Sequence, residues 1–322
     1  MTLPLSDALV LLGRWLQAAG YQFTSVTPAT HARVNARSGA DMARSLRDVF
    51  GWSRPFHAGL LPAEALDWLQ GGGLLQEDRQ REQGKQGGGG LRSRVRFSTL
   101  GGQLYAHSAY PTLEADAVFF GPDSYRFVSL IEAELGHQPL GPGARILDIG
   151  CGAGPGGIAA ALASLDSELF LADINPQALA FARANAQLAG LLDARFVQSD
   201  LFASIEGRFD LIVANPPYLV DAGERAYRHG GGALGSGLSV RIAAESLERL
   251  APGGRLILYT GAPIVEGNDP FLKEVAPLVE QAGGLFSYRE IDPDVFGEEL
   301  DLPAYAGVER IAAVALVATP PA

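Results

Sequence analysis

From about residue 143 onward, short apolar segments alternate regularly with longer amphipathic ones, and this alternation limits the folds open to the chain. Strand–helix alternation at this spacing predicts a mostly parallel β-sheet with helices on both faces. An acidic connection without a crossover helix, 292–306, predicts that the last strand is inserted antiparallel. The expected strands cover 145–150, 168–173, 194–200, 209–215, 255–261, 285–291 and 310–318, and the expected helices 156–165, 176–189, 237–250 and 270–282.

The first third of the chain has a different, mostly helical pattern. Helices are expected over 7–19, with Ser6 or Asp7 as its cap, over 39–50 and over 62–69. The polar, glycine-rich segment 71–90 is expected to be a mobile surface loop, and 91–109 a β-hairpin around two central glycines. The chain is therefore expected to hold a smaller mixed domain over 1–115 and an α/β domain over 116–322.

The net charge of −11 is unevenly distributed. Residues 1–110 carry a balance of +4 and the remainder −15. An acidic main body repels a phosphate backbone, so any contact with nucleic acid is expected to run through the N-terminal region.

Composition and cysteine content argue against a membrane protein and against a metalloprotein. No apolar stretch approaches the ~20 residues of a membrane span, and no basic residue precedes Asp7, so we expect a cytoplasmic protein with no membrane partner. The single cysteine, Cys151, and five scattered histidines show no metal-ligand spacing, and no metal is expected.

A buried strand runs into a glycine-rich turn and then a helix in the segment that begins at Arg145. The turn lacks the Cβ atoms that would block a ligand, and the helix start offers free amide hydrogens. A turn of this kind also occurs where a strand and a helix only pack tightly, so it favours a ligand only weakly by itself. The residues concerned are Asp148, Gly150, Cys151, Gly152 and Gly154.

Polar residues at the ends of the following strands strengthen the case for a ligand site. Asp173 stands where an acidic residue reaches a ribose diol, Asp200 could accept a hydrogen bond from an adenine amino group, and Asn215 ends the next strand. The carboxyl ends of such strands face one crevice. Because Asp148 precedes the glycines, a ligand that carries positive charge is favoured, which indicates S-adenosylmethionine as cofactor over NAD.

The tetrapeptide Asn215-Pro216-Pro217-Tyr218 directly follows an apolar strand. Two prolines fix the backbone and remove two donors, which leaves a rigid corner of hydrogen-bond acceptors. The Asn215 side-chain oxygen and the Pro216 carbonyl could each accept a hydrogen from a planar NH2 group and aim its nitrogen at a methyl group. Tyr218 could supply a flat face for that target. The sequence thus indicates methyl transfer to a conjugated nitrogen.

These motifs resemble those of the class I S-adenosylmethionine-dependent methyltransferases of the N-P-P-Y group, closest to the HemK/PrmC-like family. The resemblance covers about 118–318 and rests on the glycine loop, on Asp173-Ile174-Asn175-Pro176, on Asp200 and on the tetrapeptide. It implies a Rossmann-like, seven-stranded sheet, with Cys151, Ile174 and Leu201 also among the cofactor-binding positions. It further implies N-methylation, of a glutamine side chain in the release-factor enzymes and of adenine N6 or guanine N2 in close relatives.

Substrate contacts are expected from two further segments. Pro122, Asp123 and Tyr125 lie in a segment similar to the R-P-D-T-E motif of HemK-like enzymes, although Gly121 and Tyr125 replace its arginine and glutamate. Residues 224–232 follow the tetrapeptide and could form a flap, or simply a connecting loop, with Arg228 or His229 touching substrate.

Three functions remain open at this point. The first is N-methylation of a protein amide, with 1–115 as the substrate-recognition domain. The second is methylation of an rRNA or tRNA base, in which a row of arginines (Arg92, Arg94 and Arg96) tracks phosphates. That row can equally be the solvated face of a hairpin. The third is a cofactor-binding module without catalysis that recruits a partner.

Overall fold

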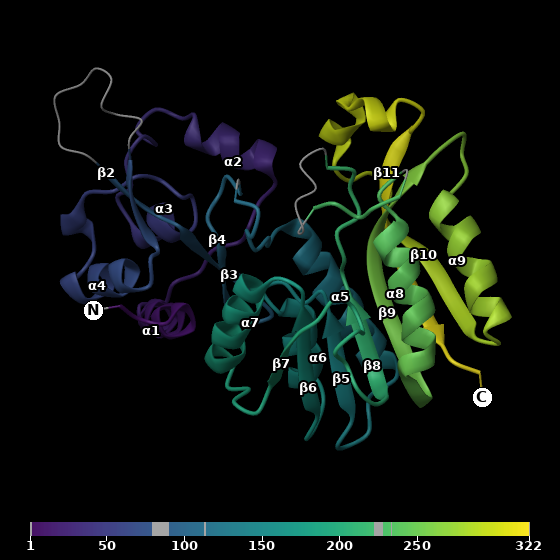
Figure 1. Ribbon diagram of the computed structural model, residues 1–322. Helices are drawn as coiled ribbons and strands as arrows, with labels where there is room; N and C mark the ends of the chain where they lie inside the picture. The colour runs from purple at the N-terminus through teal and green to yellow at the C-terminus, as the bar shows by residue number, and fades with distance from the viewer. Residues whose placement is uncertain (1, 79–89, 113, 222–227, 233, 322) are drawn as a thin grey trace. The chain divides into compact units, whose positions relative to one another are not determined.

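The computed structural model describes residues 2–78, 90–112, 114–221, 228–232 and 234–321. Figure 1 shows its helices and strands along the chain. The chain divides into two compact units. Unit 1 comprises Met1–Tyr125 with Ala180–Leu192, and unit 2 comprises Arg126–Leu179 with Asp193–Ala322.

Unit 2 contains a seven-stranded sheet in the order β10-β11-β9-β8-β5-β6-β7. Strands β9, β8, β5, β6 and β7 run parallel, whereas β11 pairs antiparallel with both β9 and β10. The expected mostly parallel sheet with its last strand inserted antiparallel is therefore confirmed. The strands are β5 (Arg145–Ile149), β6 (Glu168–Asp173), β7 (Arg195–Gln198), β8 (Phe209–Ala214), β9 (Leu250–Ile264), β10 (Leu285–Asp292) and β11 (Arg310–Thr319).

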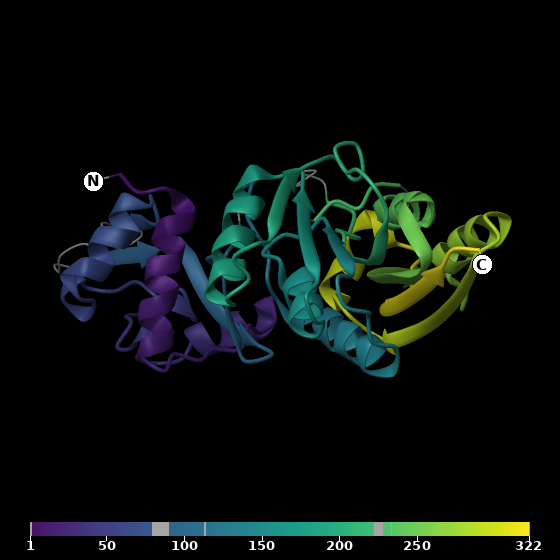
Figure 2. The ribbon, with the colours of Figure 1, turned by 90° about the horizontal axis from the view of Figure 1, so that it is seen from below.

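Helices flank this sheet on both faces, as Figure 2 shows. Side chains of a strand alternate between its two faces, and in β5 Leu147 and Ile149 join a buried cluster with residues of α8 and α9. Asp148 therefore faces the opposite side, where α6 begins. Three helices lie entirely within the described part of unit 2, namely α6 (Pro155–Leu162), α8 (Gly237–Arg249) and α9 (Pro270–Gln281). Two more, α5 (Pro122–His137) and α7 (Pro176–Leu188), are divided between the two units.

The helices of unit 1 only partly match the expectation. The single helix expected over 39–50 is wrong, because Gly39 has a positive φ of 78° and Ser45 accepts a hydrogen bond from the Asp48 amide to cap a short helix. The first helix has Pro4 at its cap position and no side-chain cap. The four helices are α1 (Leu5–Ala18), α2 (Pro28–Asn35), α3 (Leu46–Phe50) and α4 (Ala63–Gly71).

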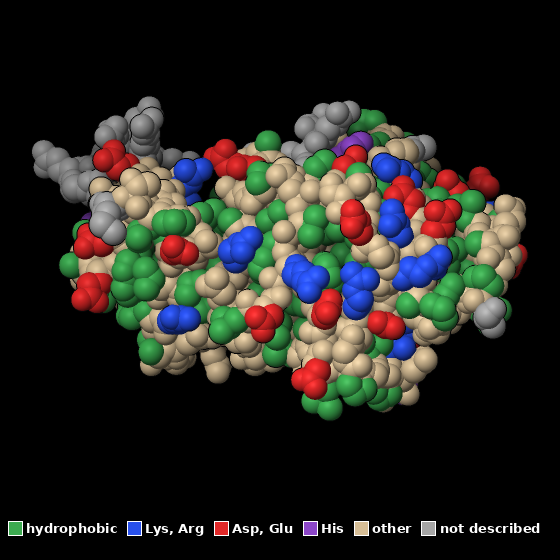
Figure 3. Space-filling model, turned by 60° about the horizontal axis from the view of Figure 1, so that its bottom comes forward, with side chains coloured by type: hydrophobic (Ala, Val, Ile, Leu, Met, Phe, Trp, Pro, Cys, Tyr) green, Lys and Arg blue, Asp and Glu red, His purple; other side chains and the backbone are tan. Residues whose placement is uncertain are grey.

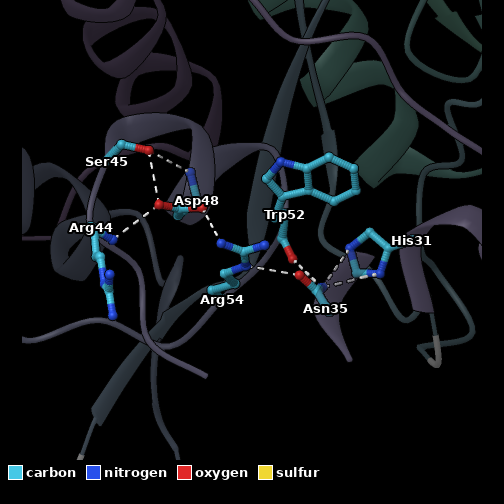
Figure 4. A network of polar contacts seen from close by, with 7 residues as sticks. All are labelled: His31, Asn35, Arg44, Ser45, Asp48, Trp52 and Arg54. Carbon is cyan, nitrogen blue, oxygen red and sulfur yellow. Dashed lines mark hydrogen bonds and ion pairs between the residues drawn. The ribbon is translucent and has the colours of Figure 1, made fainter. Parts of the chain in front are cut away.

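A polar network connects α2 and α3 within this unit (Figure 4). Asn35 donates from Nδ2 to the Trp52 carbonyl at 2.9 Å, and Arg54 donates from Nε to Asn35 Oδ1 at 2.9 Å. Arg54 also forms an ion pair with Asp48. The charges of Arg54 and Asp48 therefore balance each other within this network.

Unit 1 also holds two antiparallel strand pairs. The predicted hairpin turn is confirmed, since β3 (Val95–Leu100) pairs with β4 (Gln103–Ser108) across Gly101 and Gly102, whose φ angles are both positive. The preceding residues instead form β2 (Gly90–Ser93), which pairs with β1 (Leu75–Asp78). The expected loop over 71–90 thus includes the strand β1, and its residues 79–89 lie outside the described part of the chain.

The arginine row does not form one solvated face. Arg96 is only 4% exposed, Arg92 pairs with Asp78, and Arg94 lies near Glu114. Arg92 lies in β2, which pairs with β1, whereas Arg96 lies in β3, which pairs with β4, so the arginines do not belong to one strand face.

Candidate functional site

The glycine turn after β5 forms a cradle that lacks side chains. Gly150, Gly152 and Gly154 have φ angles of 66°, 53° and 81°, in the left-handed region that favours glycine. A Cβ atom built at Gly150 or Gly152 would meet no atom of the chain within 4 Å. Cys151 anchors the turn, since its amide donates to the Ala172 carbonyl at 3.0 Å. The turn therefore borders open space at the carboxyl end of β5.

Cys151 itself has a packing role. Its side chain is buried, and burial raises the pKa of the thiol well above its ordinary value, with Asp173 and Asp148 adding to the rise. A thiol held in the neutral form is a poor nucleophile.

Asp148 lies beneath the turn and holds the start of α6. It is 1% exposed, and its Oδ2 accepts a hydrogen bond from the Gly157 amide at 2.7 Å. A Cβ at Gly157 would lie 2.9 Å from the Asp148 Cβ, so only glycine permits this close approach. Burial raises the pKa of Asp148 to about 7, opposed by the Gly157 hydrogen bond, while the charge of Asp173 adds to the rise.

Asp173, the last residue of β6, connects the cradle to the next helix. Its Oδ2 accepts from the Gly152 amide at 2.9 Å and its Oδ1 from the Asn175 amide at 2.8 Å. Burial raises the pKa of Asp173, and these hydrogen bonds oppose the rise. The next side chain, Ile174, is 55% exposed, an unusual position for an isoleucine. A carboxylate and an exposed apolar side chain thus stand side by side at the edge of the cradle.

The segment after β7 contributes Asp200 and Leu201. Asp200 is exposed and lies two residues beyond the strand rather than at its end. Leu201 is buried with a positive φ of 46°. The Ser199 amide donates to the Asp173 carbonyl at 3.1 Å, which holds the start of this segment against the end of β6.

Asn215 and Pro216 follow β8, the neighbour of β5 on the other side from β6. Asn215 is half-buried. No described residue donates a hydrogen bond to its side-chain oxygen or to the Pro216 carbonyl. Two acceptors at the carboxyl edge of the sheet are thus available to a ligand.

The second half of the tetrapeptide, Pro217 and Tyr218, is held by contacts with other parts of the chain. Tyr218 is 6% exposed, and its ring lies 5.9 Å from that of Phe296 in an edge-to-face arrangement. A Cβ at Gly230 would lie 2.6 Å from the Pro217 carbonyl oxygen, and one at Gly235 2.3 Å from the Tyr218 carbonyl oxygen. The backbone of the tetrapeptide therefore packs so closely against Gly230 and Gly235 that no side chain fits at either position.

The flap hypothesis concerns residues of which 224–227 lie outside the described ranges. Arg228 forms ion pairs with Glu299 and, at 3.3 Å, with Asp221. The Asp221 amide donates to His229 Nδ1 at 3.3 Å. Both side chains have contacts within the chain, and a contact with substrate stays a prediction.

Sequence reasoning missed three residues between β10 and β11. Phe296 packs on Tyr218, Glu299 pairs with Arg228, and the Tyr305 hydroxyl accepts from the Val220 amide at 2.8 Å. The segment expected only as an irregular connection therefore supports the tetrapeptide. The only local sequence feature that could have indicated a functional role for this segment is its run of Glu and Asp residues beside aromatic residues.

Pro122, Asp123 and Tyr125 belong to unit 1, at the start of α5. Asp123 is buried, and the Tyr125 hydroxyl accepts from the Ser25 amide at 2.9 Å. Their role toward substrate stays a prediction.

The residues of unit 2 fit the expected cofactor. A glycine cradle without side chains, a carboxylate at the end of β6 and an exposed isoleucine beside it suit a ligand with a ribose and an adenine ring. Within the described ranges, no group of His, Cys, Asp and Glu side chains could hold a metal ion. No described helix is both long and apolar enough to cross a membrane.

The sheet order, the glycine cradle and the Asn-Pro-Pro-Tyr corner define a class I S-adenosylmethionine-dependent methyltransferase. Residues 130–264 match the model of the methyltransferase small domain family.

Curated relatives narrow the class further. A release factor glutamine methyltransferase of Deinococcus radiodurans is 33% identical over 64% of this chain and 73% of its own length. A release factor glutamine methyltransferase of Yersinia pestis is 29% identical over 77% of this chain and 84% of its own length. A ribosomal RNA small subunit methyltransferase C of Chromohalobacter salexigens is 35% identical, over 37% of this chain and 32% of the relative. The chain belongs to the HemK-like family of release factor glutamine methyltransferases.

Proposed function

We propose that this enzyme transfers the methyl group of S-adenosylmethionine to the side-chain amide nitrogen of a glutamine in a protein. The observation that carries this proposal is a pair of acceptors to which no described residue donates, the Asn215 side-chain oxygen and the Pro216 carbonyl oxygen. An amide NH2 group has two hydrogens to donate and matches such a pair. The two relatives that this chain covers over most of their length are both glutamine methyltransferases.

The geometry addresses the chemical difficulty of the reaction. The lone pair of an amide nitrogen is delocalised, which makes it a weak nucleophile. Two fixed acceptors orient the nitrogen and stabilise the positive charge that develops on it as the new bond to carbon forms. The extra proton then leaves to water, so no strong base is needed at the corner. S-adenosylmethionine, when bound, supplies the methyl group and departs as a neutral thioether.

We assign the cofactor contacts to the cradle. Gly150, Gly152 and Gly154 let the backbone approach the ligand, and Asp173 accepts from the ribose hydroxyls through its remaining lone pairs. Ile174 covers one face of the adenine, and Asp200 accepts from its amino group. Asp148 acts from beneath by holding the turn and α6 together.

A ribosomal RNA or tRNA base is the second candidate substrate, and one observation favours it: part of the chain is similar to a ribosomal RNA methyltransferase. Its amino group would fit the same two acceptors. However, RNA binding needs several unpaired cations. On the face shown in Figure 3, Lys and Arg side chains lie among Asp and Glu side chains. The protein substrate is therefore favoured, and the module without catalysis has no observation in its support.

Isotopically labelled methyl donor tests the proposal directly. The purified enzyme is incubated with labelled S-adenosylmethionine and cell extract, and the protein and RNA fractions are separated. Label in protein that is released on hydrolysis as N5-methylglutamine supports the proposal. Label in N6-methyladenine or N2-methylguanine of RNA would refute it in favour of the second candidate.

A further inference from the structure

Unit 1 contains a buried arginine without a counter-charge. Arg96 lies on β3 opposite His107 of β4 and is 4% exposed. Its Nε and Nη2 atoms are enclosed and have no hydrogen-bond partner in the described part of the chain. A buried cation without a partner is strongly unfavourable, so such a group calls for an explanation.

The surroundings of this side chain are mostly aromatic. The Phe23 ring lies 5.4 Å from the Arg96 Cζ. Burial lowers the pKa of Arg96 to about 10, and the hydroxyls of three tyrosines, namely Tyr21, Tyr125 and Tyr110, act against this change. Tyr110 and Tyr125 are half-buried, so this cluster reaches the surface at their side chains. We call these residues, together with Phe23 and His107, the Arg96 cluster.

Two histidines of the unit are also held neutral. His107 is buried, with Nε2 at 2.8 Å from the Ser98 hydroxyl and Nδ1 at 3.1 Å from the Ser108 carbonyl. Since a carbonyl only accepts, Nδ1 carries the proton and Nε2 accepts from Ser98. Burial first, and then the charge of Arg96, lower the pKa of both His107 and His31. The electrostatic potential around Arg96 is therefore positive, and no described carboxylate pairs with this arginine.

Other arginines of the unit show the contrast. Arg54 pairs with Asp48 in the network of Figure 4, Arg92 with Asp78 and Arg94 with Glu114. Arg96 has no carboxylate within ion-pair distance among the described residues. Arg96 is thus buried and lacks the carboxylate partner that these three arginines have.

We propose that Arg96 is the anion-binding residue of a recognition site in unit 1, and that its ligand is a single carboxylate of a protein. A guanidinium binds a carboxylate through two parallel hydrogen bonds, and the free Nε and Nη2 atoms provide one such pair of donors. The ring of Phe23 and the tyrosines would cover the apolar part of the bound residue.

A nucleic acid is the less suitable ligand. Binding to a phosphate backbone uses a series of exposed cations, whereas Arg96 is 4% exposed and Arg54, Arg92 and Arg94 are engaged with carboxylates. One recessed guanidinium among aromatic rings suits one anionic side chain or chain end. The assignment of this carboxylate to the methylation substrate rests on the proposed function, but the binding site itself does not.

Thermal unfolding of the full chain at constant ionic strength tests the site, because a ligand that binds the folded state raises the Tm. N-acetylglutamic acid α-amide presents a side-chain carboxylate, N-acetylglutamine an α-carboxylate, and N-acetylglutamine amide neither. We expect one or both carboxylates to raise the Tm, and the neutral compound not to. The compound that acts shows whether the site takes a side chain or a chain end.

Arg96→Met is expected to weaken this binding by at least about tenfold, since a charge-assisted pair is lost. Without ligand, Arg96→Met should be as stable as the parent protein, because the removed charge had no partner. Arg94→Met is the matched control and should keep the response. Arg96→Lys keeps a positive charge but lacks the planar guanidinium with its paired donors, so the carboxylate should raise its Tm only weakly. This variant replaces Arg96→Met in the test if the methionine variant does not fold.

An equal response in Arg96→Met, no response to either carboxylate, or a response to inorganic phosphate alone would each overturn the proposal. In the methylation reaction with a protein acceptor, Arg96→Met should raise KM and leave kcat unchanged. This result is distinct from a failure of the proposed function, in which label never enters protein.

Discussion

The ring of Tyr218 lies directly on Gly261 of β9, so close that a Cβ at Gly261 would be 2.3 Å from the Tyr218 Cδ2 atom. The last residue of the Asn-Pro-Pro-Tyr corner therefore depends on a glycine two strands away from the cradle.

Gly261→Ala should displace the tyrosine and disturb the corner. Overpacking at a buried site costs ~1–3 kcal/mol, and we expect this loss in the free energy of unfolding, together with a fall in kcat. Gly136→Ala, in the exposed part of α5 with open space around it, is the control and should be neutral or slightly stabilising. Unchanged stability and turnover in Gly261→Ala would show that the ring does not need this position.

Gly152→Ala should separate cofactor binding from folding. A Cβ meets no atom of the chain there, so only the positive φ of 53° is unfavourable, by about 1 kcal/mol. Calorimetry should show a larger loss of affinity for S-adenosylmethionine than this, because the Cβ would occupy ligand space. Gly102→Ala, with a φ of 76° in the hairpin of unit 1, carries the same strain and should leave affinity unaltered.

Asp148 should make stability depend on pH. Burial raises its pKa from 3.8 to about 7 in the folded state. Between these values the folded protein keeps a proton that the unfolded chain loses, so the contribution of this group to stability falls as the pH rises from about 4 to about 7.

Asp148→Asn removes this dependence, and its amide oxygen can still accept from Gly157. The unfolding free energy of the variant, relative to the parent, should therefore increase from pH 4.5 to pH 7.5 in urea titrations. A constant difference across this range would show that the carboxyl titrates in the folded state as it does in the unfolded chain.

The ion pair between Arg228 and Glu299 joins the segment between β10 and β11 to the residues that follow the tetrapeptide, and its removal tests how much this contact stabilises the protein. Arg228→Met removes a positive charge beside the buried carboxylate of Glu299, and we expect the free energy of unfolding to fall by ~1–3 kcal/mol. The double variant with Glu299→Leu should recover most of it. Arg289→Met breaks a more exposed pair with Glu134 and should lose less than about 1 kcal/mol. Strictly additive losses in the double variant would mean that the two side chains do not act together.

The positions of the strands in the sequence could be predicted because their signals are local. The strand 168–173 is a continuous apolar run that ends in Asp173, and the structure has the same bounds. The helix α2 was missed because its sequence, PATHARVN, carries little apolar periodicity. Its start depends on the Thr27 cap and Pro28, signals that are weak without a hydrophobic stripe.

Long-range contacts could not be read from any local pattern. Tyr305 contacts Val220 across 85 residues of sequence, and Arg228 contacts Glu299 across 71. The burial of Arg96 is of the same kind, since alternation in the strand predicts only that every second residue shares a face. Which face is covered depends on Phe23 and its neighbours, far away in sequence.

Asn215→Ala tests the central claim most directly, because this side chain makes no hydrogen bond to the described part of the chain and its loss should not affect folding. Single-turnover methyl transfer to the protein acceptor is measured beside calorimetric binding of S-adenosylmethionine. We predict unchanged cofactor affinity and a fall in the rate of methyl transfer of at least about 100-fold. Methyl transfer at the parent rate in this variant would contradict the account.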